Sequence, residues 1–144
     1  MLEDHLYWTM VWFRWIDRDN FAKGPAHFAD GAPEPAREEL RRKMYESRVA
    51  DLHSQGIGRH DPAQVAELGG RSLQALATLL GDQPHLLGER ASAVDAFAFA
   101  LLASILTPFF DSPLRRAAQG HANLVAYTAR MMRRHYPGQA WEAA

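Results

Sequence analysis

The sequence predicts an all-α helical bundle. Apolar residues recur at intervals of three and four along most of the chain, which is the spacing of one face of an α-helix. Glycine and proline residues separate the helical stretches, and no convincing strand pattern stands between them. With 144 residues, the chain has the size of one domain that can bury a core without disulfides.

The first helix is expected over residues 3–20, followed by a loop over 23–35. Its two apolar stripes share the i, i+4, i+7 spacing and consist of Leu6, Met10 and Phe13, and of Trp8, Trp12 and Trp15. A surface helix normally buries one stripe. Two stripes therefore predict contacts on two sides: with the body of the domain, and with something else. Internal aromatic packing is the alternative interpretation.

Four more main helices are expected, which makes about five in all. Their ranges are 35–55, 61–80, 92–106 and 121–135, with a brief helical turn after Pro113. The inner faces are expected at Leu40, Met44 and Leu52 in the second helix, and at Val65, Leu68, Ser72, Leu76 and Leu79 in the third. Arg37, Arg41, Arg42 and Lys43 are interpreted mostly as a solvated face. The Gly69-Gly70 pair indicates either close approach of another backbone or a helix break.

Composition excludes several classes of function. The net charge of −1 gives no general electrostatic reason to bind nucleic acid or anionic lipid. The longest nearly apolar run, residues 96–106, is about half of the ~20 residues of a membrane span, so we expect no transmembrane segment. The seven histidines lack metal-ligand spacing, so we expect no metal site. The absence of cysteine and of a basic signal sequence favours a cytoplasmic protein.

Ser92 and Asp95 form an S-x-x-D capping box at the start of the most apolar helix. Ser92 can accept from the backbone N–H of Asp95, and Asp95 can accept from that of Ser92. We therefore interpret Asp95 as a structural capping residue and not as a catalytic acid. The helix that follows is apolar nearly all round, which predicts a central position in the bundle.

This box and five other segments resemble the C-terminal helical domain of glutathione S-transferases, in the branch of failed-axon-connections proteins and metaxins. The segments are Leu87-Gly88-Glu89-Arg90, Leu6-Tyr7-Trp8, Arg14-Trp15, Gln55-Gly56-Ile57-Gly58-Arg59-His60 and Asn123-Leu124-Val125-Ala126-Tyr127. The Gln55–His60 stretch is the most specific. The resemblance implies one domain over residues 1–144, weakest in the alanine-rich stretch after Pro137.

In that family, an N-terminal thioredoxin-like domain binds the co-substrate glutathione and supplies the catalytic group. The resemblance therefore implies that the domain missing from this chain is a partner of it, and that no catalytic or cofactor-binding residue lies here. The family's first helix lines the site of a small hydrophobic electrophile. By resemblance, Tyr7, Trp8, Val11 and Trp12 are the candidates for that wall.

Two hypotheses about function follow. In the first, the chain is the helical half of a glutathione transferase-like protein, inactive alone, that contributes the co-substrate wall and contacts to the other domain or to a second subunit in a homodimer. In the second, it is a non-enzymatic interaction module of the metaxin or failed-axon-connections type. The tryptophan stripe would then be a protein interface.

Overall fold

A computed structural model describes residues 1–139, and all of its regular structure is helical, as the sequence predicts. The α-helices are α1 (Tyr7–Trp15), α2 (Arg18–Lys23), α3 (Ala36–Gln55), α4 (Pro62–Leu80), α5 (Ala93–Leu106), α6 (Pro113–Gln119) and α7 (Ala122–His135). Three shorter helical elements are η1 (Leu2–Leu6), η2 (Pro25–Ala29) and η3 (Ile57–Arg59). Within residues 1–139 the only β-type pairing is an isolated bridge between His85 and Gly88.

The prediction of a single helix over residues 3–20 is wrong, because α1 ends at Trp15 and a second helix begins at Arg18. Asp17 adopts an extended backbone conformation, and its side chain accepts a hydrogen bond from the N–H of Asn20 at 2.9 Å. An aspartate in this position is a good N-cap, so it starts a new helix, α2, instead of continuing α1. The loop expected over 23–35 is also partly helical, since it contains η2.

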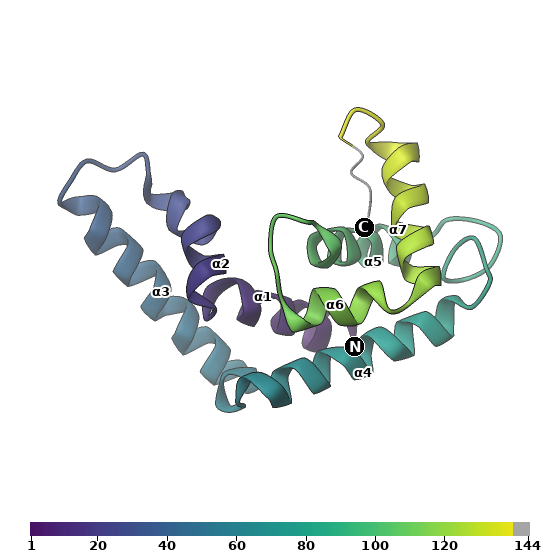
Figure 1. The fold of residues 1–144 in the computed structure, drawn as a ribbon, viewed down its shortest axis with the longest axis horizontal. Coiled ribbons are helices and arrows are strands. Elements are labelled where there is room, and N and C mark those ends of the chain that lie inside the picture. The colour runs from purple at the N-terminus through teal and green to yellow at the C-terminus, as the bar shows by residue number, and fades with distance from the viewer. Residues whose placement is uncertain (140–144) are drawn as a thin grey trace.

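The helices form a body and an arm (Figure 1). The long helix α4 runs beneath the body, where α5, α6 and α7 pack with α1 and η1. The segments α2, η2 and α3 project to the other side as the arm, and α3 returns to the start of α4 through η3. Helix α1 contacts α2 and α3 as well as α4, α5 and α6, so it joins the two parts.

Most side chains of the two stripes of the first helix pack within this chain. Leu6, Met10 and Phe13 lie in the buried core. On the other side, the Trp15 ring packs against the rings of Phe21 and Phe28, with centroids 5.9 and 6.3 Å away. Trp12 is itself buried in the core, so for Trp12 and Trp15 the structure favours the alternative interpretation, internal aromatic packing.

The prediction that the inner helix faces are buried is wrong for two residues. Leu40 and Leu79 are exposed, whereas Leu52, Val65, Ser72 and Leu76 are buried and Met44 and Leu68 are partly buried. Leu40 is exposed because only the C-terminal end of α3 reaches the core. Leu79 is exposed because the buried stripe of α4 continues to Leu80 instead.

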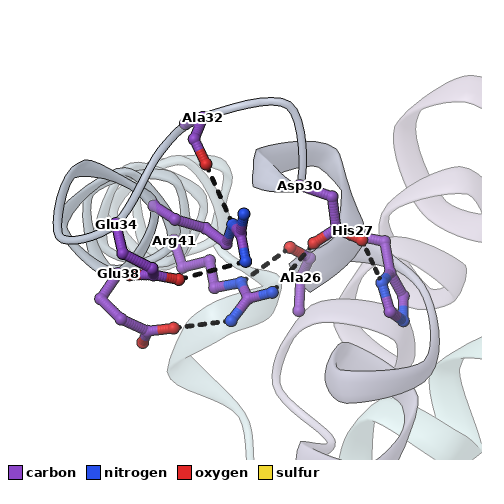
Figure 2. A network of polar contacts seen from close by, with 8 residues as sticks. Ala26, His27, Asp30, Ala32, Glu34, Glu38 and Arg41 are labelled. Carbon is purple, nitrogen blue, oxygen red and sulfur yellow. Dashed lines mark hydrogen bonds and ion pairs between the residues drawn. The ribbon is translucent and has the colours of Figure 1, made fainter.

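The basic face of α3 is not simply solvated, because two of its arginines attach α3 to the preceding segment (Figure 2). Arg41 donates through Nε to the carbonyl of Ala26 at 3.1 Å and pairs with Asp30 at 2.9 Å. Arg37 donates through Nε to the carbonyl of Ala32 at 3.0 Å. These bonds join α3 to the backbone of the segment before it. Such bonds stabilise the arm more than exposed ion pairs alone would.

The Gly69-Gly70 pair does not break the helix, since α4 is continuous through it, and Gly69 is approached closely by side chains and not by another backbone. A Cβ on Gly69 would lie 2.5 Å from Cδ1 of buried Leu114 and 3.2 Å from Oγ1 of Thr9, but a Cβ on Gly70 would meet nothing within 4 Å. Helix α4 therefore needs the first glycine to contact α6 and α1. The second glycine has no such role.

The pair makes a matched test. Gly70→Ala should raise the free energy of unfolding by up to about 1 kcal/mol, because alanine is the better helix former. Gly69→Ala should lower it by roughly 1–3 kcal/mol, because the buried neighbours must move. Urea denaturation of both variants measures the difference. Equal effects of the two substitutions would contradict the close packing at Gly69.

Candidate functional site

The four residues suggested for a co-substrate wall do not share one surface. Val11 and Trp12 are 6% and 8% exposed and belong to the core. Tyr7 is 36% exposed and Trp8 is partly buried, and their rings make an edge-to-face pair with centroids 5.4 Å apart. Of the four, Tyr7 and Trp8 are thus the ones that offer a surface to a ligand.

Hydrogen bonds between Ser92 and Asp95 cap the N-terminal end of α5. The two residues have the geometry of a capping box, with Ser92 in an extended conformation as the N-cap. Oδ2 of Asp95 accepts from the backbone N–H of Ser92 at 2.9 Å and from its hydroxyl at 2.7 Å. The carboxylate thus satisfies a backbone donor that the helix itself leaves unpaired.

The second oxygen of Asp95 reaches beyond α5. Oδ1 accepts from the backbone N–H of Leu86 at 2.8 Å and from the hydroxyl of Tyr127 at 3.1 Å. Asp95 is only 1% exposed. One buried carboxylate therefore connects the loop after α4, the start of α5 and the middle of α7.

These contacts keep Asp95 charged and Tyr127 neutral. Burial by itself would raise the pKa of Asp95, but the hydrogen bonds from Leu86, Ser92 and Tyr127 outweigh it and hold the pKa below its usual value. Burial, and then the negative charge of Asp95, raise the pKa of Tyr127 well above that of an ordinary tyrosine. The carboxylate is therefore a saturated acceptor, unsuited to proton transfer at neutral pH.

A largely apolar cavity of about 680 Å³ lies beside this cluster, between α5 and α7. The small side chains of Ala91, Ala96, Ala100 and Ala103 leave the space, and the larger apolar or aromatic walls are Phe99, Met131, Met132 and Tyr136. Phe99 and Tyr136 are stacked, with centroids 6.0 Å apart and planes at 26°. The volume lies within the roughly 300–1,000 Å³ of small-molecule sites.

The polar groups of this cavity are suited to binding and not to covalent catalysis. Ser92, Asp95, His135 and Gln139 also line it. The Ser92 hydroxyl already donates to Asp95, whose lowered pKa makes it a weak base. A serine nucleophile needs a base that takes its proton. The arrangement therefore offers an apolar surface with a few fixed polar groups.

Residues 1–139 contain no group of three or more histidine, aspartate or glutamate side chains placed to hold a metal ion. None of the helices within that range has the length and apolar character that a membrane span requires.

We call Asp95 and the residues around its carboxylate, Ser92, Leu86, Tyr127 and His85, the Asp95 cluster. Two of these residues, Tyr127 and His85, were not predicted from the sequence as part of it. Tyr127 lies on the buried face of α7 with Leu124, Thr128 and Met131, and a tyrosine on an apolar face signals a buried hydrogen-bond partner. His85 is buried with its Nδ1 unpaired, 3.8 Å from Oδ1 of Asp95. It lies in an irregular loop, where no sequence periodicity indicates which side chains are buried.

Comparison with known proteins agrees with this architecture. The family model of the glutathione S-transferase C-terminal domain matches residues 69–131, a stretch that includes Ser92, Asp95 and Tyr127. The chain is 27% identical over 141 residues to isoprene-epoxide–glutathione S-transferase of Rhodococcus sp. (strain AD45), with 94% of this chain and 58% of that protein covered. No solved structure matches the chain significantly.

Two further relatives belong to the branch that the sequence resembles. Failed axon connections of Drosophila melanogaster is 28% identical over 150 residues, with 95% of this chain and 36% of that protein covered. Human metaxin-1 is 28% identical over 153 residues, with 100% of this chain and 32% of that protein covered. The chain thus spans less than two thirds of the length of each of these relatives.

The all-helical fold and these matches agree with the resemblance: residues 69–131 match the glutathione S-transferase C-terminal domain, and nearly the whole chain is similar to a glutathione S-transferase. Its similarity to failed axon connections and to metaxin-1 relates it to the metaxin-like branch.

Asp95→Asn tests the role of the buried carboxylate. The amide cannot accept from all of the donors that the carboxylate satisfies, so the free energy of unfolding at pH 7 should fall by about 2–4 kcal/mol. Asp61→Asn, at the exposed capping box of α4, is the matched control and should change stability little, because asparagine is an equally good N-cap. Urea denaturation gives both values.

The contribution of Asp95 to the free energy of unfolding should also depend on pH. Because folding lowers its pKa, its stabilisation is complete above the unfolded value of about 3.9 and is lost as the pH falls through the folded pKa. The difference between the wild type and Asp95→Asn should therefore narrow below about pH 4. A constant difference from pH 7 to pH 3 would contradict an ionised Asp95.

Proposed function

We propose that this chain is the C-terminal helical half of a glutathione S-transferase-like protein. A thioredoxin-like domain elsewhere in the full protein would bind glutathione, and the helical half would bind a small hydrophobic electrophile for conjugation. The main support is the similarity to isoprene-epoxide–glutathione S-transferase, because its alignment covers 94% of the chain and therefore most of the body and the arm.

Two apolar surfaces are available for that electrophile. Tyr7 and Trp8 form the accessible part of the first-helix wall, and Val11 and Trp12 belong to the core beneath it. The cavity between α5 and α7 is the larger hollow. We assign the co-substrate wall to Tyr7 and Trp8, with the α5–α7 cavity as the competing surface.

The chain alone should not catalyse conjugation. A transferase of this kind holds the glutathione thiolate next to the electrophile, and that proximity supplies much of the rate. Glutathione would be bound by the thioredoxin-like domain, so the helical half supplies only one of the two binding sites. We place the full protein in the cytoplasm, since the sequence has no cysteine that needs an oxidising compartment.

The test uses the full-length gene product. It should bind glutathione in a calorimetric titration and conjugate it to small epoxides. Trp8→Ala should raise KM for the electrophile by roughly 3–10-fold with glutathione affinity unchanged, because it removes apolar contact area from one substrate only. Phe109→Ala, at an exposed residue on the α5–α6 loop, is the control and should leave both constants unchanged.

Ala100→Leu addresses the competing surface, because it fills part of the α5–α7 cavity. If it raises KM and Trp8→Ala does not, the electrophile binds between α5 and α7 instead. Absence of glutathione binding together with inactivity on a broad panel of electrophiles would overturn the transferase proposal.

A second function is favoured by one feature of the arm. Phe28 is 72% exposed, and with partly buried Trp15 and Met44 it lines a hollow of about 380 Å³, which we call the Trp15–Phe28 patch. Large exposed aromatic side chains often anchor protein interfaces. The alternative function is therefore a non-enzymatic interaction module, here tested as a homodimer through this patch.

Light scattering with size-exclusion chromatography tests this alternative. A dimer should form at micromolar concentrations, and Phe28→Ser should dissociate it by raising its dissociation constant at least about tenfold. Leu87→Ser, at another strongly exposed apolar residue, is the matched control and should leave the dimer intact. A strictly monomeric wild type would exclude a homodimer through the patch.

A further inference from the structure

The turn between α3 and α4 contains the most specific sequence pattern of the chain, and the proposed function does not use it. Gly56 ends α3 with φ of +116°, a conformation that favours glycine. A Cβ on Gly58 would lie 2.7 Å from the backbone nitrogen of His53, so the turn packs directly on the end of α3. Ile57, between the glycines, is buried in the core.

The polar residues of the turn are fixed by bonds to the backbone. Gln55 donates through Nε2 to the carbonyl of Asp4 at 2.8 Å and accepts from the N–H of Ile57 at 3.0 Å. Arg59 donates through Nε to the carbonyl of His53 at 3.0 Å. Gln55 thereby attaches the turn to η1, and the Arg59 guanidinium is held at the C-terminal end of α3.

A mixed polar and apolar cavity of about 550 Å³ lies between this turn, η1 and α4. The residues that line it are Asp4, His5, Thr9, Gln55, Gly56, Ile57, Arg59, His60 and Leu68. Ile57 and Leu68 supply apolar surface, and Arg59, His5 and His60 supply hydrogen-bond donors. The space is large enough for a small organic molecule.

These donors are not used by the described part of the protein. Within residues 1–139, Arg59 forms no ion pair, and its one hydrogen bond uses Nε, so both terminal guanidinium nitrogens remain available. In the same range no side-chain hydrogen bond involves the ring of His5 or His60. A guanidinium with two free nitrogens matches the two oxygens of a carboxylate.

We propose that this cavity is a binding site for a small organic carboxylate. The carboxylate would lie on Arg59, with His5 and His60 as neighbouring donors and the apolar part of the ligand against Ile57 and Leu68. Asp4 lines the same cavity and limits the negative charge that it accepts. The ligand is therefore a monoanion with an apolar group, and multiply charged anions are disfavoured.

NMR spectroscopy of the intact chain tests this proposal with benzoate as the probe. The ring resonances of His5 and His60 should shift in a saturable manner, whereas those of His121, at the start of α7, should not. Benzamide has the same shape without the charge and should bind at least about tenfold more weakly, because a charge-assisted bond is lost. Inorganic phosphate should also bind more weakly than benzoate. Equal binding of benzamide, or preferred binding of phosphate, would overturn the assignment.

Two substitutions with opposite expected effects on the affinity for benzoate complete the test. Arg59→Gln should weaken benzoate binding at least about tenfold, while Arg71→Gln, on the exposed side of α4, should have no effect. Because Arg59 also holds the end of α3, Asp4→Asn supplies a variant that leaves that bond in place. It should strengthen benzoate binding severalfold by removing a repelling charge. Weaker binding by Asp4→Asn, or equal binding by the two arginine variants, would contradict the proposal.

Discussion

The carboxylate of Asp95 is the contact on which the body of the domain depends. It accepts four hydrogen bonds, from Leu86, from Tyr127 and twice from Ser92. These donors come from three segments that are separate in the sequence. A buried charge is stabilising only when its oxygens are fully satisfied. Correct assembly of the body therefore depends on Asp95. The carboxylate of Asp95 is fully paired in the central position of α5 only if the loop before α5 and α7 are also in place.

Most of the accessible surfaces lie apart from the Asp95 cluster; the α5–α7 cavity, which Ser92 and Asp95 line, is the exception. The Asp95 cluster and the buried stripe of α4 hold the body, and α1 connects the body to the arm. The surfaces open to ligands or partners lie at the edges of these packed parts: Tyr7 and Trp8 on α1, the α5–α7 cavity, the Trp15–Phe28 patch and the cavity at the α3–α4 turn. Both proposed functions therefore rest on side chains at the surface of the same helical bundle.

Much of the fold could be predicted from the sequence, because helical periodicity and capping residues are local signals. The helices corresponding to α3, α4, α5 and α7 lie close to their expected ranges. The break at Asp17 was missed because the apolar stripes hide an N-cap in the middle of the pattern. The exposure of Leu40 and Leu79 depends on the placement of the arm and on the rotation of α4, which are tertiary properties. For the candidate site, residue type alone did not show that Val11 and Trp12 are buried while Tyr7 and Trp8 are accessible. The cavities depend on the approach of distant segments, for which no local pattern exists.

Amide hydrogen exchange at Leu86 and Ser92 tests the central role of Asp95 most directly. Both amides lie outside regular helices, yet both donate to the buried carboxylate. If the cluster is a condition of assembly, the two amides should exchange only through global unfolding, with protection equal to that of the core of α5. Exchange as fast as that of Leu87, an exposed neighbour in the same loop, would show that the loop opens independently and that Asp95 does not hold the body together.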